Sequence, residues 1–100
     1  MITIKTESEI DLLREPCAIV RDTLAYVGSK VKPGITTAEL DAFAEEYIRS
    51  RGAEPSCLGY CGYPASICAS VNEVVVHGIP GDRVIREGDI VSIDLCAYKN

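Results

Sequence analysis

Two short motifs of the same kind each predict the start of a helix in the first half of this 100-residue sequence. Thr6 is followed three residues later by Glu9, and Thr36 is followed three residues later by Glu39. This is the spacing of a capping box, in which the two side chains satisfy free backbone amides at a helix start. Apolar residues then recur every three or four positions after each box, so the sequence predicts two amphipathic helices.

The first helix is predicted over about residues 7–30 and the second over about residues 37–51. Because proline lacks an amide hydrogen, we expect a kink or a break at Pro16. Gly52 stands where a glycine commonly ends a helix. The acidic face of the second helix is expected to be solvated; it consists of Glu39, Asp41, Glu45 and Glu46.

Beyond Pro55 the pattern changes to short apolar runs separated by glycine and proline. Strands are predicted over residues 66–71, 74–77 and 90–98, the last being the best defined. Helices followed by strands favour an α+β fold, with the two helices packed on a mostly antiparallel sheet.

The strand predicted over residues 90–98 has two different faces, because alternate side chains of a strand point to opposite sides. One face is wholly apolar and is expected to pack on the helices; it consists of Val91, Ile93, Leu95 and Ala97. The other face carries Asp94 and resembles a cavity wall; it consists of Ile90, Ser92, Asp94, Cys96 and Tyr98. A buried carboxylate here needs a proton, an arginine or a metal ion as its partner.

Cysteine spacing and charge limit the remaining function classes. A zinc site built on Cys57, Cys61 and the single histidine His77 is disfavoured, because no second paired cluster is present. The net charge of −5 without a basic block argues against direct binding of nucleic acid. The sequence shows neither a signal-peptide pattern at its start nor an apolar run long enough for a membrane span, so we expect a cytoplasmic protein with reduced thiols.

The segments that carry the chemistry resemble type I methionine aminopeptidases. They read C-L-G-Y-C-G-Y-P over residues 57–64, N-E-V-V-V-H-G-I-P over residues 72–80 and G-D-I-V-S-I-D over residues 88–94. The resemblance extends to Lys32-Pro33-Gly34 and to both predicted helices, and so covers essentially the whole sequence. It implies the N-terminal half of a pita-bread fold, in which two related α+β halves surround a site for two divalent metal ions.

The resemblance also implies roles for individual residues. Asp94 matches a metal ligand of the family, and cobalt, manganese, iron and zinc are the candidate metals. His77 matches a catalytic histidine that contacts the substrate near the scissile peptide bond. Tyr60, Tyr63 and Cys68 match residues that line the methionine side-chain pocket, although core packing is nearly as good an explanation of Cys68. Cys61 replaces a histidine common in the family and is placed at the mouth of the substrate pocket.

The resemblance implies that residues 1–100 form the N-terminal portion of a catalytic domain. One carboxylate cannot hold two metal ions, so we expect the isolated chain to be inactive and its full-length parent to remove the initiator methionine from nascent polypeptides. The implied partners are a peptide or nascent chain with methionine first and, as a further candidate, the ribosome, with the enzyme a monomer. The alternative is a non-enzymatic half-fold or pseudoenzyme that binds a peptide or a partner protein. A creatinase or proline-dipeptidase relative fits residues 57–80 poorly.

Overall fold

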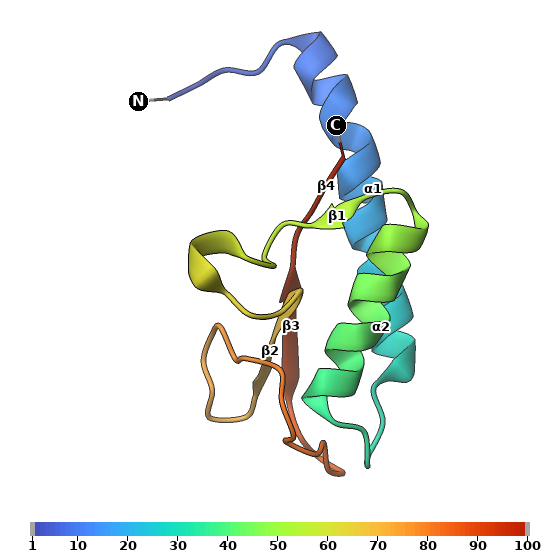
Figure 1. Ribbon diagram of the computed structural model, residues 1–100, viewed down its shortest axis with the longest axis vertical. Helices are drawn as coiled ribbons and strands as arrows, with labels where there is room; N and C mark the ends of the chain where they lie inside the picture. The colour runs from blue at the N-terminus through green and yellow to red at the C-terminus, as the bar shows by residue number, and fades with distance from the viewer. Residues whose placement is uncertain (1, 100) are drawn as a thin grey trace.

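Two long helices form one layer of the computed structural model, which describes residues 2–99. Helix α1 spans Glu7–Lys30 and helix α2 spans Thr37–Ser50, and the two lie side by side (Figure 1). Both predicted capping boxes are confirmed. In the first, the Thr6 amide donates to Glu9 Oε1 at 2.8 Å and the Glu9 amide donates to Thr6 Oγ1 at 3.2 Å.

Helix α1 continues through Pro16 without a break, contrary to the break considered from the sequence. A proline inside a helix removes only one backbone hydrogen bond, and here its ring is buried. Helix α2 ends one residue earlier than predicted, and Gly52 follows its C-cap residue Arg51 with a φ of 75°. The predicted role of Gly52 is therefore confirmed, because this left-handed conformation favours glycine.

The strands form two small antiparallel sheets within residues 2–99. Strand β2 (Ile67–Val71) pairs with β3 (Val91–Leu95), and β1 (Glu54–Pro55) pairs with β4 (Ala97–Tyr98). The predicted α+β fold with antiparallel pairing is confirmed. The strand predicted over residues 90–98 is divided at Cys96, because the chain changes from one pairing partner to the other at that point.

The strand predicted over residues 74–77 is wrong, because the chain turns at residues 72–73 and continues as a loop. Asn72 has a φ of 51°, a left-handed conformation that ends the strand. Val75 and Val76 are then 84% and 63% exposed, so their apolar side chains reflect a surface loop and not a packed strand.

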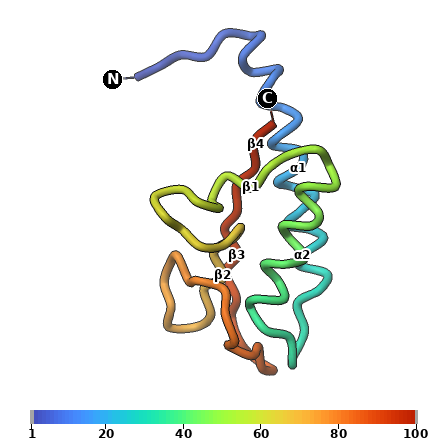
Figure 2. The backbone as a smooth tube through the Cα atoms, viewed as in Figure 1, coloured from blue at the N-terminus to red at the C-terminus, as the bar shows by residue number. Residues whose placement is uncertain are grey.

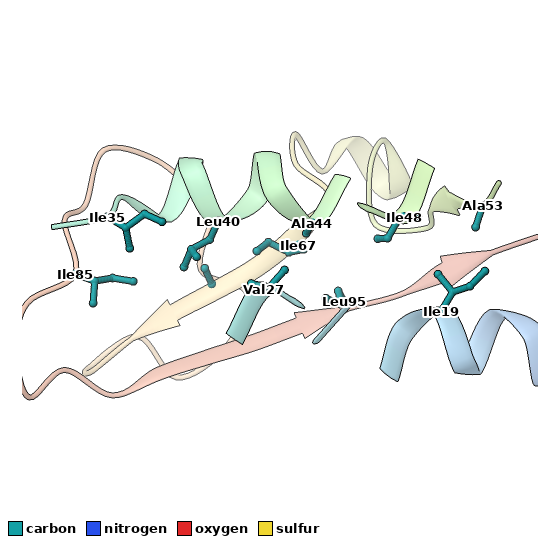
Figure 3. Packing of buried hydrophobic residues seen from close by; sticks show 11 residues of the cluster. Ile19, Val27, Ile35, Leu40, Ala44, Ile48, Ala53, Ile67, Ile85 and Leu95 are labelled. Carbon is teal, nitrogen blue, oxygen red and sulfur yellow. The ribbon is translucent and has the colours of Figure 1, made fainter. Parts of the chain in front are cut away.

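The core lies between the helices and the sheet formed by β2 and β3 (Figure 3). Val27 of α1 and Leu40 and Ile48 of α2 are fully buried against Ile67 and Leu95 of the strands. The face predicted to pack on the helices is confirmed, because Leu95 belongs to this core and Val91, Ile93 and Ala97 pack against it. The opposite face of β3 is consequently directed away from the helices.

Candidate active site

A pocket of about 320 Å³ lies on the helix-distant face of β3. The loop between β1 and β2 and the first part of the loop after β2 lie on the side of the strands away from the helices (Figure 2). The later part of the second loop returns to the start of α2, where the Ala38 amide donates to the Gly81 carbonyl at 2.9 Å. The lining residues are Cys57, Tyr60, Tyr63, Cys68, His77, Asp94 and Cys96. The pocket thus combines a carboxylate, an imidazole, two phenols and three thiols.

Five of the six site residues predicted from the sequence line this one pocket, namely Tyr60, Tyr63, Cys68, His77 and Asp94. Cys61 is not among the lining residues; it is exposed in the short 3-10 helix Tyr60–Gly62, with a φ of 51°. Sequence reasoning gave no role to Cys57 and Cys96, which also line the pocket. The alternation of side chains in the strand predicted over residues 90–98 places Cys96 on the same face as Asp94, and this was the sequence signal that Cys96 could line the pocket.

Asp94 lies on β3 directly opposite Cys68 of β2 in the antiparallel register. Its side chain faces the pocket and is exposed, so in residues 2–99 it is not in the buried state that would require a positive partner. Within residues 2–99, no lysine or arginine forms an ion pair with Asp94. The carboxylate is therefore free to bind a cation or a substrate group that enters the pocket.

His77 is held at the pocket by the backbone of the next residue, Gly78. The Gly78 amide donates to Ser70 Oγ at 3.0 Å, and the Ala69 amide donates to the Gly78 carbonyl at 2.9 Å. His77 itself has a φ of 55°, a conformation that costs energy in a residue other than glycine. The loop is thus fixed to β2 in a strained conformation, a feature that is concentrated at functional sites.

Tyr63 joins the two loops of the pocket. Its hydroxyl donates a shared hydrogen bond to the carbonyls of Ile67 at 2.9 Å and Gly78 at 3.2 Å. Burial and the neighbouring Cys68 thiol raise the pKa of Tyr63 far above its ordinary value, so the hydroxyl remains protonated and can donate. Tyr60, in contrast, is 73% exposed and presents its ring at the open side of the pocket.

The start of β2 is positioned by two acidic residues of α2. Asp41 Oδ1 accepts hydrogen bonds from the amides of Ser66 at 2.8 Å and Ile67 at 2.9 Å, and Glu45 accepts one from the Ser66 hydroxyl at 2.9 Å. Burial raises the pKa of Asp41, although the two amide bonds oppose this effect. The expectation that this acidic face is merely solvated is therefore wrong for Asp41 and Glu45, which connect the helix layer to the strand that carries Cys68.

The described residues supply one candidate metal ligand, Asp94, and no complete metal site. No group of three or more histidine, cysteine, aspartate or glutamate side chains in residues 2–99 is arranged to hold a metal ion. An exposed carboxylate suits a hard divalent cation, but two such ions need several more oxygen or nitrogen ligands. The residues present therefore fit one ligand of a metal site and do not by themselves form a two-metal site.

Comparison with known proteins places this pocket in a family. The sequence profile of metallopeptidase family M24 matches residues 11–100, so the chain belongs to the M24 metallopeptidases. It is 54% identical over 94 residues to the methionine aminopeptidase of Clostridium perfringens, a match that covers 94% of this chain and 38% of that protein. The crystal structure of methionine aminopeptidase from Thermotoga maritima superposes with a TM-score of 0.94 at 39% identity.

The chain spans about two fifths of the length of these relatives. The match to the Thermotoga structure covers 98% of this chain and 40% of that one. The Xaa-Pro dipeptidase of Bacillus anthracis is also similar, with a TM-score of 0.80 at 30% identity over 95% of this chain. The predicted pita-bread fold is thereby confirmed. In the part of the chain that the structure describes, neither helix is both long and apolar enough to cross a membrane.

Proposed function

We propose that the full-length protein containing these residues is a metal-dependent methionine aminopeptidase that releases the initiator methionine from nascent polypeptides. The pocket carries this proposal, since it brings Asp94, His77 and the two tyrosines to one face of β3. The 54% identity to the methionine aminopeptidase of Clostridium perfringens supports the same activity. Residues 1–100 then form the N-terminal portion of the catalytic domain.

In this proposal some pocket residues act at the scissile peptide bond of the substrate, and the others contact the side chain of its first residue. Asp94 is one ligand of a divalent metal site that residues outside this sequence complete, and cobalt, manganese, iron and zinc are the candidate metals. His77 contacts the substrate near the scissile peptide bond, where a neutral imidazole can donate or accept a hydrogen bond. Both residues line the same pocket, as this division requires.

The methionine side chain occupies the part of the pocket lined by Tyr60, Tyr63 and Cys68. Aromatic rings and a polarizable thiol form favourable contacts with a thioether sulfur. The Tyr63 hydroxyl is already bound to two backbone carbonyls, so its ring and not its hydroxyl is available to the substrate. Cys61, which is exposed beside Tyr60, is a candidate contact for the substrate only at the pocket mouth.

The remaining parts of the proposal concern the setting in which the enzyme works. We propose a monomeric cytoplasmic enzyme that acts on peptides or nascent chains with methionine first. The ribosome is a candidate partner, because it presents such nascent chains. Direct binding of nucleic acid is not part of the proposal, since the net charge is −5.

The test is release of free methionine from the tripeptide Met-Ala-Ser by the full-length protein with added manganese or cobalt. We expect release that requires the metal and is lost when a chelator is present. The Cys17→Ser variant, whose side chain lies on α1 outside the pocket, is the matched control and should retain full activity. A folded full-length protein that releases no methionine with either metal would contradict the proposal.

A second candidate is a non-enzymatic half-fold that binds a peptide or a partner protein. It is favoured by the lack of a complete metal-ligand group within residues 2–99. Calorimetry measures the binding of manganese to the 100-residue chain. Tight binding of two ions by the chain alone would exclude this alternative. Weak or no binding, combined with methionine release by the full-length protein, supports the enzyme.

A further inference from the structure

Three of the five cysteines line the candidate active site, and two of them come from neighbouring backbone segments. The amide of Ser56 donates to the carbonyl of Cys96 at 3.1 Å. This bond extends the antiparallel pairing of β1 and β4 one position beyond the pair of Pro55 and Ala97. Cys57 is therefore one residue along the chain from the position opposite Cys96.

This arrangement places Cys57 beside the backbone segment that carries Cys96, and both cysteines line the same pocket. Residues opposite each other in an antiparallel pair, here Ser56 and Cys96, have Cα atoms about 4.5–5.5 Å apart, and Cys57 is the residue after Ser56. A disulfide requires Cα atoms about 4.4–6.8 Å apart. Residues one apart on a regular strand point to opposite faces, but the chain leaves strand geometry after β1, and the Cys57 and Cys96 side chains both line the pocket. Burial raises the pKa of Cys57, and the nearby Cys96 thiol raises it further. The second effect is expected of two thiols that lie close together.

The third thiol of the pocket is less available for such a bond. Cys68 is only 6% exposed, on β2, and lies beside the Tyr63 hydroxyl. Cys96, in contrast, is exposed, and Cys57 is half-buried. A solution oxidant would therefore meet Cys96 first, with Cys57 as the thiol placed to respond.

We propose that Cys57 and Cys96 form a reversible disulfide at the pocket when the protein meets a low-molecular-weight disulfide such as oxidised glutathione. The Cys96 thiolate attacks one sulfur of oxidised glutathione, forming a mixed disulfide and releasing one glutathione thiolate. The Cys57 thiolate then attacks the Cys96 sulfur of the mixed disulfide, and the second glutathione leaves. Overall, two cysteine thiols are oxidised, one glutathione disulfide is reduced to two thiols, and the protons of the cysteines pass to glutathione.

The bond has a direct consequence for the pocket, and this part rests on the proposed peptidase function. Cys96 follows β3 and is two residues from Asp94, and Cys57 follows Ser56, whose amide is hydrogen-bonded to the Cys96 carbonyl. A disulfide between them would lie in the wall of a pocket of only about 320 Å³ and would change the space for a substrate side chain. Oxidation is thus expected to inhibit the enzyme, and a dithiol reductant is expected to restore it.

The test uses the full-length protein at a series of ratios of oxidised to reduced glutathione, followed by alkylation of free thiols and peptide mass spectrometry. Trypsin cleaves after Arg51, Arg83, Arg86 and Lys99, so Cys96 is released on residues 87–99 and separated from the other pocket cysteines on residues 52–83. Chymotrypsin cleavage after Tyr60 then separates Cys57 from Cys61 and Cys68.

We expect a linked peptide pair that maps to Cys57 and Cys96 and disappears on addition of dithiothreitol. Cys57→Ser and Cys96→Ser should each abolish it, whereas Cys68→Ala and Cys17→Ser should retain it. For each variant, methionine release is compared between its own oxidised and reduced forms. Wild type should lose activity at least about tenfold on oxidation, and the ratio should stay near one in Cys96→Ser, which lacks the attacking thiol. In Cys57→Ser the mixed disulfide is not resolved, so a glutathione adduct on Cys96 is expected there.

Other linkages would overturn the inference. These include a bond from Cys57 to Cys68 or Cys61, stable glutathione adducts alone, or no linkage at any glutathione ratio. A linked pair with unchanged methionine release would overturn the inhibitory role. Because disulfide mapping does not depend on activity, a reduced protein that releases no methionine would instead contradict the proposed function.

Discussion

Gly78 lies so close to Ala69 that a Cβ atom added to Gly78 would be 2.3 Å from the Ala69 carbonyl oxygen. The close approach is maintained by the hydrogen bond from the Ala69 amide to the Gly78 carbonyl. Because Gly78 follows His77, this contact between a loop and a strand decides where the only imidazole of the sequence lies.

The first prediction concerns this contact. Gly78→Ala should lower the free energy of unfolding by about 1–3 kcal/mol, because a buried backbone has to move to admit the methyl group. It should also reduce methionine release, since His77 moves with the loop. Gly81→Ala is the matched control, because the nearest atom to its Cβ would be 3.9 Å away. Equal stability of the two variants in chemical denaturation would contradict the contact.

The second prediction concerns Asp94. Asp94→Asn keeps the size of the side chain but removes the charge that a divalent cation requires, so we expect methionine release to fall at least about 100-fold. The thermal midpoint without added metal should change little, because the side chain is exposed and forms no ion pair within residues 2–99. Activity close to wild type at saturating manganese would exclude Asp94 as a metal ligand.

The third prediction concerns the acceptor at the start of β2. Asp41→Ala leaves the amides of Ser66 and Ile67 without their acceptor, which should cost about 1–3 kcal/mol of stability. Both amides donate to the same oxygen, so Asp41→Asn, which keeps one carbonyl oxygen, should cost less than Asp41→Ala. Glu46→Ala, on the exposed side of α2, should be neutral. Urea unfolding of the three variants checks this role of Asp41: the unfolding midpoint should be lowest for Asp41→Ala, higher for Asp41→Asn and highest for Glu46→Ala.

The fourth prediction concerns pH. Burial raises the pKa of Asp41 above its ordinary value of 3.8, so the folded chain holds this proton more tightly than the unfolded chain does. The contribution of Asp41 to stability is then greatest below pH 3.8 and decreases as the pH rises through the raised folded-state pKa. The stability of wild type relative to Asp41→Asn should therefore decline over this range. A carboxyl NMR titration that finds the Asp41 pKa below 3.8 would refute the direction.

The fifth prediction compares the two pocket tyrosines. Tyr63→Phe removes the hydroxyl that joins the carbonyls of Ile67 and Gly78 and should cost about 1 kcal/mol. The amide of Gly78 should also exchange faster with solvent, because its loop loses one attachment. Tyr60→Phe should leave both quantities unchanged, since Tyr60 is 73% exposed and its hydroxyl forms no hydrogen bond within residues 2–99. Matching exchange rates in the two variants would argue against the joining role.

The sequence by itself determined the features that depend on neighbouring residues. Both helices begin where a threonine and a glutamate three residues apart cap them, and these contacts need no other part of the chain. The two faces of β3 follow from the two-residue period, which correctly predicted that Leu95 packs on the helices and Asp94 faces the pocket.

The tertiary structure decided the features that depend on distant partners. Asp41 reads as one acid among several on a helix face, and only the fold brings it to amides 25 and 26 residues away. Residues 74–77 have the composition of a strand, yet they form no strand pairing: Val74 makes only a turn hydrogen bond to Val71, and the residue bonded to Ala69 of β2 is Gly78. Residue composition expresses local preference, whereas strand pairing depends on which backbone groups still need a hydrogen-bond partner once the core has packed. The same pairing places the segments that carry Cys57 and Cys96 next to each other.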